Sequence, residues 1–363
     1  MSDLFIDLFK LRHNINKIRE VCLAKKLELI GVVKGCYTFS PIIQAFQKEG
    51  IGTLGMSRIQ VGIEASVYLN NRPLLITLPS QNEAQSVVRY FRSSLNSEIT
   101  TIKALAHAAK QQSRHHGIIL MVDNGDLREG VRPEKVLETA RKIIEINSSH
   151  ITLEGLGANL GCASGTLPSE ENIRLLDELA GDIEKRQGLP IETISIGGSL
   201  MFEWLERYPL PPRINQIRAG EIILLGNIPT YNIKHPDLYD DVFILKGEVL
   251  EVQEKPSIPP GDTGLDAFGK KQTFKNKGLR KRAILNFGIV DTVPDGLHCR
   301  YKNVDIITCN SDYTIADVTD CEVPLKTGDR IEFTMNYNAM VQALLSPFVR
   351  IILVGDKEPG SAL

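Results

Sequence analysis

The sequence predicts an α/β protein of two domains: an N-terminal (β/α)8 TIM barrel over residues 1–235 and a C-terminal, mostly antiparallel β domain over residues 236–363. The barrel is predicted because short runs of β-branched and apolar residues alternate with stretches of helical periodicity up to Gly226. The second domain is predicted because β-rich runs continue beyond that point without helical periodicity.

The predicted barrel follows an opening strand at residues 4–8 and a helix that carries Leu11, Ile15 and Ile18 on one face. The eight runs that come next occur in about the length that a (β/α)8 barrel requires. A doubly wound open sheet is the alternative, but the glycines of residues 155–161 lack the spacing of its dinucleotide fingerprint. The predicted strands are 30–33, 53–56, 74–77, 99–102, 118–122, 153–157, 193–196 and 214–217.

The predicted β domain begins after a polar, proline-containing linker at residues 231–241. Turn residues separate its β-rich runs, which is typical of antiparallel strands. The runs are 242–252, 283–290, 304–308, 314–318 and 330–334.

Composition excludes several classes of function. The 42 basic and 44 acidic residues nearly balance, so nothing indicates a nucleic-acid partner or an anionic membrane. The six cysteines form no C-x-x-C pair, and we find neither a secretory signal nor an apolar run of membrane-spanning length. No metal-ligand spacing stands out. These features predict a soluble cytoplasmic protein with reduced thiols and no bound metal.

Lys34 stands at the end of the first predicted barrel strand, where the chain must turn outward. A lysine at the end of a buried strand is costly unless its ammonium group is solvated, paired or chemically used. A partly desolvated lysine has a lowered pKa, which suits Schiff-base chemistry. The alternative is that Lys34 caps the strand in solvent, and the other strand ends decide between the two.

The active site of a (β/α)8 barrel lies at the C-terminal ends of its strands. Glycines and a serine after strand seven, with another glycine after strand eight, predict a phosphate cradle at the usual place. A lysine, a phosphate site and two arginines facing one pocket predict pyridoxal 5′-phosphate held as a Schiff base. The residues that follow the strands are Lys34, Arg128, Asn159, Gly198, Ser199, Arg218 and Gly220.

With these motifs the chain resembles the alanine racemase family of fold-type III pyridoxal-phosphate enzymes, and most of all its ornithine racemase branch. The resemblance extends over nearly the whole chain. Val32-Val33-Lys34 resembles the family's cofactor-lysine motif, and Arg218-Ala219-Gly220 its Arg-Pro-Gly-like motif. The resemblance implies that Arg128 contacts the cofactor's phenolic oxygen, that Arg218 faces the pyridine nitrogen and that Tyr337 reaches the phosphate. It also implies a head-to-tail homodimer in which the β domain of one chain completes the other's pocket.

The sequence departs from the family at the second catalytic base. The family's catalytic tyrosine falls on Ile289, which cannot transfer a proton. Related fold-type III decarboxylases carry a Cys-Asp pair where this chain reads Cys309-Asn310-Ser311-Asp312. Our hypothesis is that Ser311 handles the second proton and that Asp312 binds the distal ammonium group of the substrate. The alternative is an ordinary polar turn.

The expected activity is racemisation of an amino acid, with Lys34 as the base on one face of Cα. A carboxylate at the pyridine nitrogen would favour decarboxylation, whereas Arg218 disfavours a proton there by like-charge repulsion. A decarboxylase of the same fold type and a non-catalytic pyridoxal-phosphate-binding protein are the alternatives. Asp312 and the resemblance favour a basic amino acid as substrate, ornithine before lysine or arginine.

Overall fold

The computed structural model describes residues 1–265, 269, 271 and 273–355. The chain divides into two compact units. One unit is Leu11–Leu238, and the other combines Met1–Lys10 with Tyr239–Leu363. No helix within the described ranges is both long enough and apolar enough to cross a membrane.

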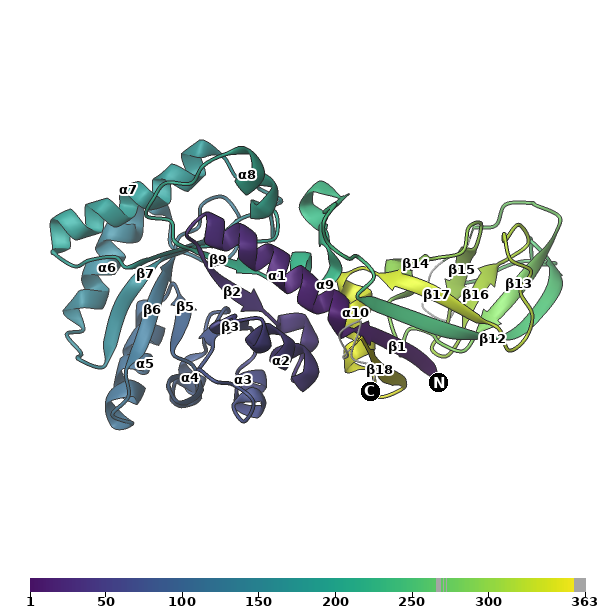
Figure 1. Ribbon diagram of the computed structural model, residues 1–363, viewed down its shortest axis with the longest axis horizontal. Coiled ribbons are helices and arrows are strands. Elements are labelled where there is room, and N and C mark those ends of the chain that lie inside the picture. Colours follow the sequence, from purple (N-terminus) through teal and green to yellow (C-terminus); the bar gives the residue numbers. More distant parts are fainter. Residues whose placement is uncertain (266–268, 270, 272, 356–363) are drawn as a thin grey trace, which may run out of the picture. The chain divides into compact units, whose positions relative to one another are not determined.

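The first unit is built on a closed barrel of eight parallel strands that follow one another in sequence order, as predicted. Figure 1 shows the helices of this unit lying along the outside of the strands. The strands are β2 (Glu28–Val32), β3 (Thr53–Met56), β4 (Leu74–Leu75), β5 (Ser93–Asn96), β6 (His116–Met121), β7 (Ile151–Asn159), β8 (Thr193–Gly197) and β9 (Gln216–Ala219). The helices are α1 (Leu8–Ala24), α2 (Ser40–Lys48), α3 (Ile59–Ala65), α4 (Ala84–Tyr90), α5 (Ile99–Gln111), α6 (Val136–Glu145), α7 (Glu170–Gln187), α8 (Met201–Arg207) and α9 (Glu221–Leu225).

Apolar side chains from several barrel strands pack together as a buried cluster. Each of them removes apolar surface from water, which is the dominant favourable contribution to folding. The interior of this barrel is therefore a packed core, and chemistry is confined to its rim. The cluster consists of Ile30, Leu74, Leu95, Ile119 and Met121, with Ile76 packed against it.

The fourth barrel strand is β5, whereas the sequence predicted residues 99–102. Those residues instead begin α5, in which Thr101 and Ile102 lie on the buried face. The prediction was wrong because β5 reads as polar. The buried Ser94 hydroxyl bonds Nε2 of the buried His116 at 2.8 Å, so polar residues are satisfied where apolar ones were expected.

The second unit is a largely antiparallel sheet, as predicted, with strand order β14-β17-β12-β13-β16-β15. The N-terminal strand β1 (Ser2–Asp7) also belongs to it, antiparallel to β12 and parallel to β18. The predicted boundary at residue 235 did not include this opening strand in the second domain. The remaining elements are β12 (Phe243–Pro256), β13 (Leu279–Leu285), β14 (Leu297–Cys299), β15 (Asp305–Cys309), β16 (Thr314–Asp317), β17 (Arg330–Met335), α10 (Tyr337–Leu345) and β18 (Val349–Val354).

A buried carboxylate holds β1 in this sheet. Asp3 is 1% exposed and accepts hydrogen bonds from Nε of Arg350 at 2.8 Å and from Arg330. These bonds lower the pKa of Asp3 below its usual value although burial opposes the shift. The interaction joins residues far apart in the sequence, which explains why local patterning did not assign β1 to this unit.

Candidate active site

Lys34 lies directly beyond β2, at the carboxyl end of the barrel. It begins a single 3-10 turn, Lys34–Cys36, which turns the chain away from the strand. The residues on either side of Lys34, Val33 and Gly35, are buried, whereas Lys34 is exposed. The chain around Lys34 is thus buried, whereas the Lys34 side chain is exposed.

Arg218 belongs to β9 itself and is buried, with 4% of its surface exposed. Its Nη1 donates to the Ser195 hydroxyl at 2.5 Å, and its Nη2 donates to the Ala158 carbonyl at 2.8 Å and to Oδ1 of Asn159 at 2.9 Å. Burial lowers the pKa of Arg218 to about 10, and the Glu129 carboxylate opposes this effect. The guanidinium therefore remains charged near neutral pH, in a fixed orientation.

Glu129 connects Arg128 with the Arg218 network. Its carboxylate accepts from Nη2 of Arg128 at 2.8 Å and from Nδ2 of Asn159 at 2.5 Å. Because Asn159 also accepts from Arg218, a continuous set of hydrogen bonds joins the ends of β6, β7 and β9. The sequence predicted Arg128, Asn159 and Arg218, and the structure brings these three together.

The loops that carry this network are tied to one another. The buried Asp126 carboxylate accepts from the backbone N–H of Cys162 and of Ala163, both at 2.8 Å. Gly130 ends the loop after β6 with φ +135°, and a Cβ there would lie 2.3 Å from the Asp123 nitrogen. Only glycine fits at this position of the loop that carries Arg128 and Glu129.

The predicted phosphate cradle lies beyond β8 and β9. Gly198 has φ +119°, and the Ser199 hydroxyl accepts from the Ile222 N–H at 3.1 Å. At Gly220 an added Cβ would come within 2.7 Å of the Val32 carbonyl oxygen, next to the strand that leads to Lys34. The structure thus places Gly198, Ser199 and Gly220 on the same edge of the barrel as Lys34.

Sequence reasoning missed two carboxylates on this edge, Glu129 and Glu221. The Glu129 carboxylate accepts a hydrogen bond from Arg128. The positive charge of Lys34 opposes the rise that burial causes in the pKa of Glu221. Both stand inside motifs that the sequence singled out, directly after Arg128 and after Gly220. The available signal was the presence of each acidic residue inside a motif already predicted to contribute to the site.

Ser311 and Asp312 occupy an exposed turn of the second unit, between β15 and β16. The Ser311 hydroxyl donates to the Asp312 carboxylate, and Oδ1 of Asn310 accepts the Asp312 N–H at 2.9 Å. The segment that carries Ile289 lies against this turn, because the Ile289 N–H donates to the Asn310 carbonyl at 3.0 Å. The position of the missing tyrosine and the position of the proposed second base are therefore adjacent in space.

Tyr337 is the first residue of α10 and is half-buried. The preceding Asn336 caps this helix, since its Oδ1 accepts the Ala339 N–H at 3.0 Å. The cap fixes the backbone from which the Tyr337 side chain extends.

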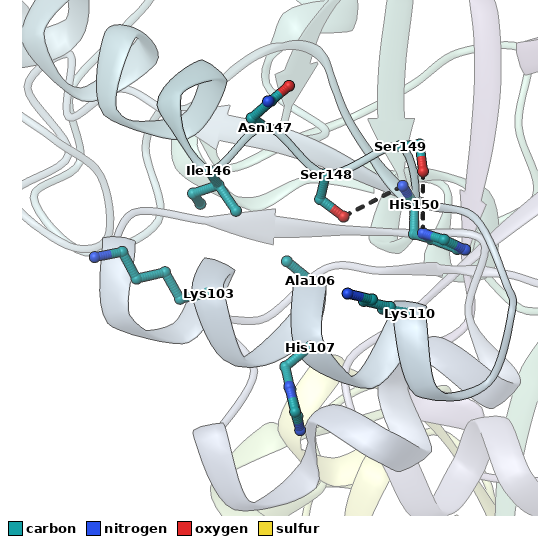
Figure 2. A pocket seen from close by; sticks show the side chains of 9 residues that line it. All are labelled: Lys103, Ala106, His107, Lys110, Ile146, Asn147, Ser148, Ser149 and His150. Atoms are coloured by element: carbon teal, nitrogen blue, oxygen red, sulfur yellow. Dashed lines mark hydrogen bonds between the residues drawn. The ribbon is translucent and has the colours of Figure 1, made fainter.

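A hollow of about 460 Å³ lies elsewhere on the barrel unit, between α5 and the loop that leads into β7 (Figure 2). In this view Lys103 and His107 extend from α5 in different directions, and Ser148 bonds toward the backbone of His150. The loop precedes a strand, so this hollow lies away from the carboxyl ends where the predicted residues gather. Among the described residues no group of His, Cys, Asp and Glu is arranged to hold a metal ion.

The fold is a closed parallel barrel that carries Lys34, Arg128 and Arg218 at the carboxyl ends of its strands, where barrel enzymes have their active sites. Residues 6–228 match the family described as alanine racemase, N-terminal domain. The chain is 34% identical to the ornithine racemase of Acetoanaerobium sticklandii, over 95% of this chain and 97% of that protein. It is 35% identical to the lysine racemase of Thermotoga maritima, over 95% and 96% of the two chains.

The chain therefore belongs to the alanine racemase family, and it is an amino acid racemase. The solved alanine racemase of Bartonella henselae, with covalently bound pyridoxal phosphate, matches 97% of this chain and 99% of its own, with a TM-score of 0.72. At 17% identity that likeness shows the fold alone.

Proposed function

We propose that the protein is a pyridoxal 5′-phosphate-dependent racemase of basic amino acids, with ornithine as the first candidate substrate. The observation that carries the proposal is the joint placement of Lys34, Arg128 and Arg218 on one edge of the barrel. The relatives named ornithine racemase and lysine racemase support a diamino acid as substrate.

The residues present on this edge fit the cofactor. Its aldehyde requires an accessible amine, which Lys34 provides, and its phosphate requires donors in a close backbone turn, which residues 198–199 and Gly220 form. Arg128 and Arg218 supply fixed positive charge for the phenolic oxygen and for the ring nitrogen. Tyr337 is the proposed further phosphate ligand.

Bound pyridoxal phosphate would withdraw electrons from the substrate and so make the proton at Cα acidic. Lys34 would remove or return this proton on one face of Cα. Arg218 is charged and donates hydrogen bonds to Ser195 and Asn159. Its charge would disfavour a proton on the ring nitrogen of the cofactor, and the weaker electron withdrawal that results would restrain reactions other than reprotonation of Cα. Asn159 and Glu129 hold the two arginines in place.

Ser311 is the proposed proton carrier for the opposite face, and Asp312 the proposed partner of the substrate's distal ammonium group. The hydrogen bond between them supports this pairing, because Asp312 can orient the Ser311 hydroxyl. In the proposed head-to-tail homodimer the β domain of the partner chain completes the site. We further propose that the enzyme acts in the cytoplasm.

The test is incubation of the cofactor-loaded protein with L-ornithine in heavy water, followed by analysis of chirality, α-deuterium and putrescine. D-ornithine that carries α-deuterium is the expected product. Putrescine would show a decarboxylase and overturn the assignment of Arg218. Absence of product from ornithine, lysine, arginine and alanine alike would leave only a pyridoxal-phosphate-binding protein.

A further inference from the structure

Glu221 is a half-buried carboxylate on the site edge to which the proposed reaction gives no role. It is the first residue of α9 and stands two positions beyond the end of β9. A carboxyl group in such surroundings is costly to ionise unless a positive charge lies near it.

The register of the barrel places Glu221 and Lys34 just beyond the adjoining ends of β9 and β2. Strands β2 and β9 are neighbours and run parallel, and Gly31 pairs with Ala219. The segments that follow these two strands remain close beyond that pair, since a Cβ on Gly220 would lie 2.7 Å from the Val32 carbonyl oxygen. Glu221 follows Gly220 directly, and Lys34 comes two residues after Val32.

The electrostatics of Glu221 agree with this placement. Burial raises the pKa of Glu221 to about 7, and the positive charge of Lys34 opposes the rise. The other cation at the end of β9, Arg218, directs its guanidinium toward Ser195 and Asn159. From the turn after β8, Ser199 adds only a neutral hydroxyl, so Lys34 is the charged group that acts on Glu221 among the described residues.

We propose that Glu221 is a positioning residue for Lys34. Its carboxylate holds the Lys34 amine at the edge between β2 and β9 and stabilises the ammonium form. Glu221 thereby sets the fraction of Lys34 that is free to bond the cofactor's aldehyde or to take the Cα proton. The inference rests on the proposed function, because that function makes Lys34 the reactive amine.

The experiment measures the reactivity of Lys34 in cofactor-free, full-length protein. Limited acetylation with acetic anhydride at pH 8, followed by peptide mass spectrometry, gives the rate at Lys34 relative to the exposed Lys103. In Glu221→Gln we expect Lys34 to react about tenfold faster, because loss of a nearby opposite charge destabilises the ammonium form. An unchanged or slower rate at Lys34 would overturn the proposal.

Glu154→Gln is the matched control. Glu154 lies on β7, and burial raises the pKa of its carboxyl group as well, but its side chain lies against Gly117 and near Arg92. The Lys34 rate in this variant should equal that of the wild type. An increase as large as that in Glu221→Gln would contradict a specific effect of Glu221.

A measurement on the unaltered protein decides the matter even if Glu221→Gln fails to fold. Because burial raises the pKa of Glu221 to about 7, the ratio of Lys34 to Lys103 acetylation should fall between pH 6 and pH 8. A constant ratio would overturn the proposal. The labelling needs no cofactor or turnover, so it can fail while ornithine is racemised, or succeed while no racemisation occurs.

Discussion

The two units carry their candidate site residues in different ways. On the barrel edge, Arg128 and Arg218 are joined through Glu129 and Asn159, and Arg218 is almost fully buried. In the β-rich unit, Ser311 and Asp312 occupy an exposed turn and bond mainly within it. This difference is the one expected if the barrel edge is preorganised for the proposed cofactor and the turn takes part in the proposed recognition of the substrate.

Replacing Lys34 should have the largest effect on activity. We expect Lys34→Ala to lower the rate of racemisation by about 10³-fold or more, because both the link to the cofactor and the base on one face are lost. Chiral chromatography of ornithine measures it. Lys103→Ala, in the hollow of Figure 2, should retain wild-type activity. Substantial activity in Lys34→Ala would place the reactive amine elsewhere.

Glu129→Gln tests whether the barrel edge depends on its internal hydrogen bonds. The substitution keeps the size of the side chain but removes the charge that Arg128 and Asn159 contact. Loss of charged hydrogen bonds of this kind costs about 1.5–3 kcal/mol, so we expect cofactor affinity to fall by about 10- to 100-fold. Absorbance titration with pyridoxal phosphate measures it. Glu134→Gln, at an exposed carboxylate paired with Arg132, is the control and should bind normally.

Asp3→Asn tests the anchoring of β1 in the other unit. We expect the free energy of unfolding at pH 7 to fall by about 1–3 kcal/mol, since Arg330 and Arg350 lose a buried charged acceptor. The pKa of Asp3 is lowered on folding, so its contribution is present above about pH 4 and is lost as the pH falls through the folded-state value. Urea titrations should show that the difference in the free energy of unfolding between wild type and Asp3→Asn is smaller at pH 3 than at pH 7. A constant difference would contradict this account.

Asp312→Ala tests whether the exposed turn recognises the substrate. We expect KM for ornithine to rise by about tenfold with a smaller change in kcat, because one charge pair to the distal ammonium is lost. Steady-state kinetics with ornithine and with alanine separate the two roles, since alanine has no distal ammonium group. Asp305→Ala, exposed at the start of β15, the strand that leads into this turn, should change neither constant. Equal effects on both substrates would argue for a merely structural turn.

The barrel was predictable because seven of its strands lie at or beside the runs named from the sequence, and because strand ends in this fold converge. The sequence singled out Lys34, Arg128, Asn159 and Arg218 as the residues that follow the strands, and the structure places them at the carboxyl ends of the barrel strands. The strand Ser93–Asn96 was missed because its polar residues bond to partners such as His116, which no local pattern reveals.

The remaining misses have the same physical origin. Strand β1 joins the second unit through β12, β18 and the contacts of Asp3, all of which are distant in sequence. The roles of Glu129 and Glu221 depend on which neighbours the barrel register supplies. Sequence periodicity predicts elements and their order, whereas these contacts arise only when strands pair.

The most direct test of the central claim is to locate the bound cofactor chemically. The protein is loaded with pyridoxal phosphate, treated with borohydride to fix a reducible link between amine and aldehyde, digested, and analysed by mass spectrometry. We predict the pyridoxyl group on the peptide that contains Lys34. A label on another lysine, or none in a protein that racemises ornithine, would contradict the account.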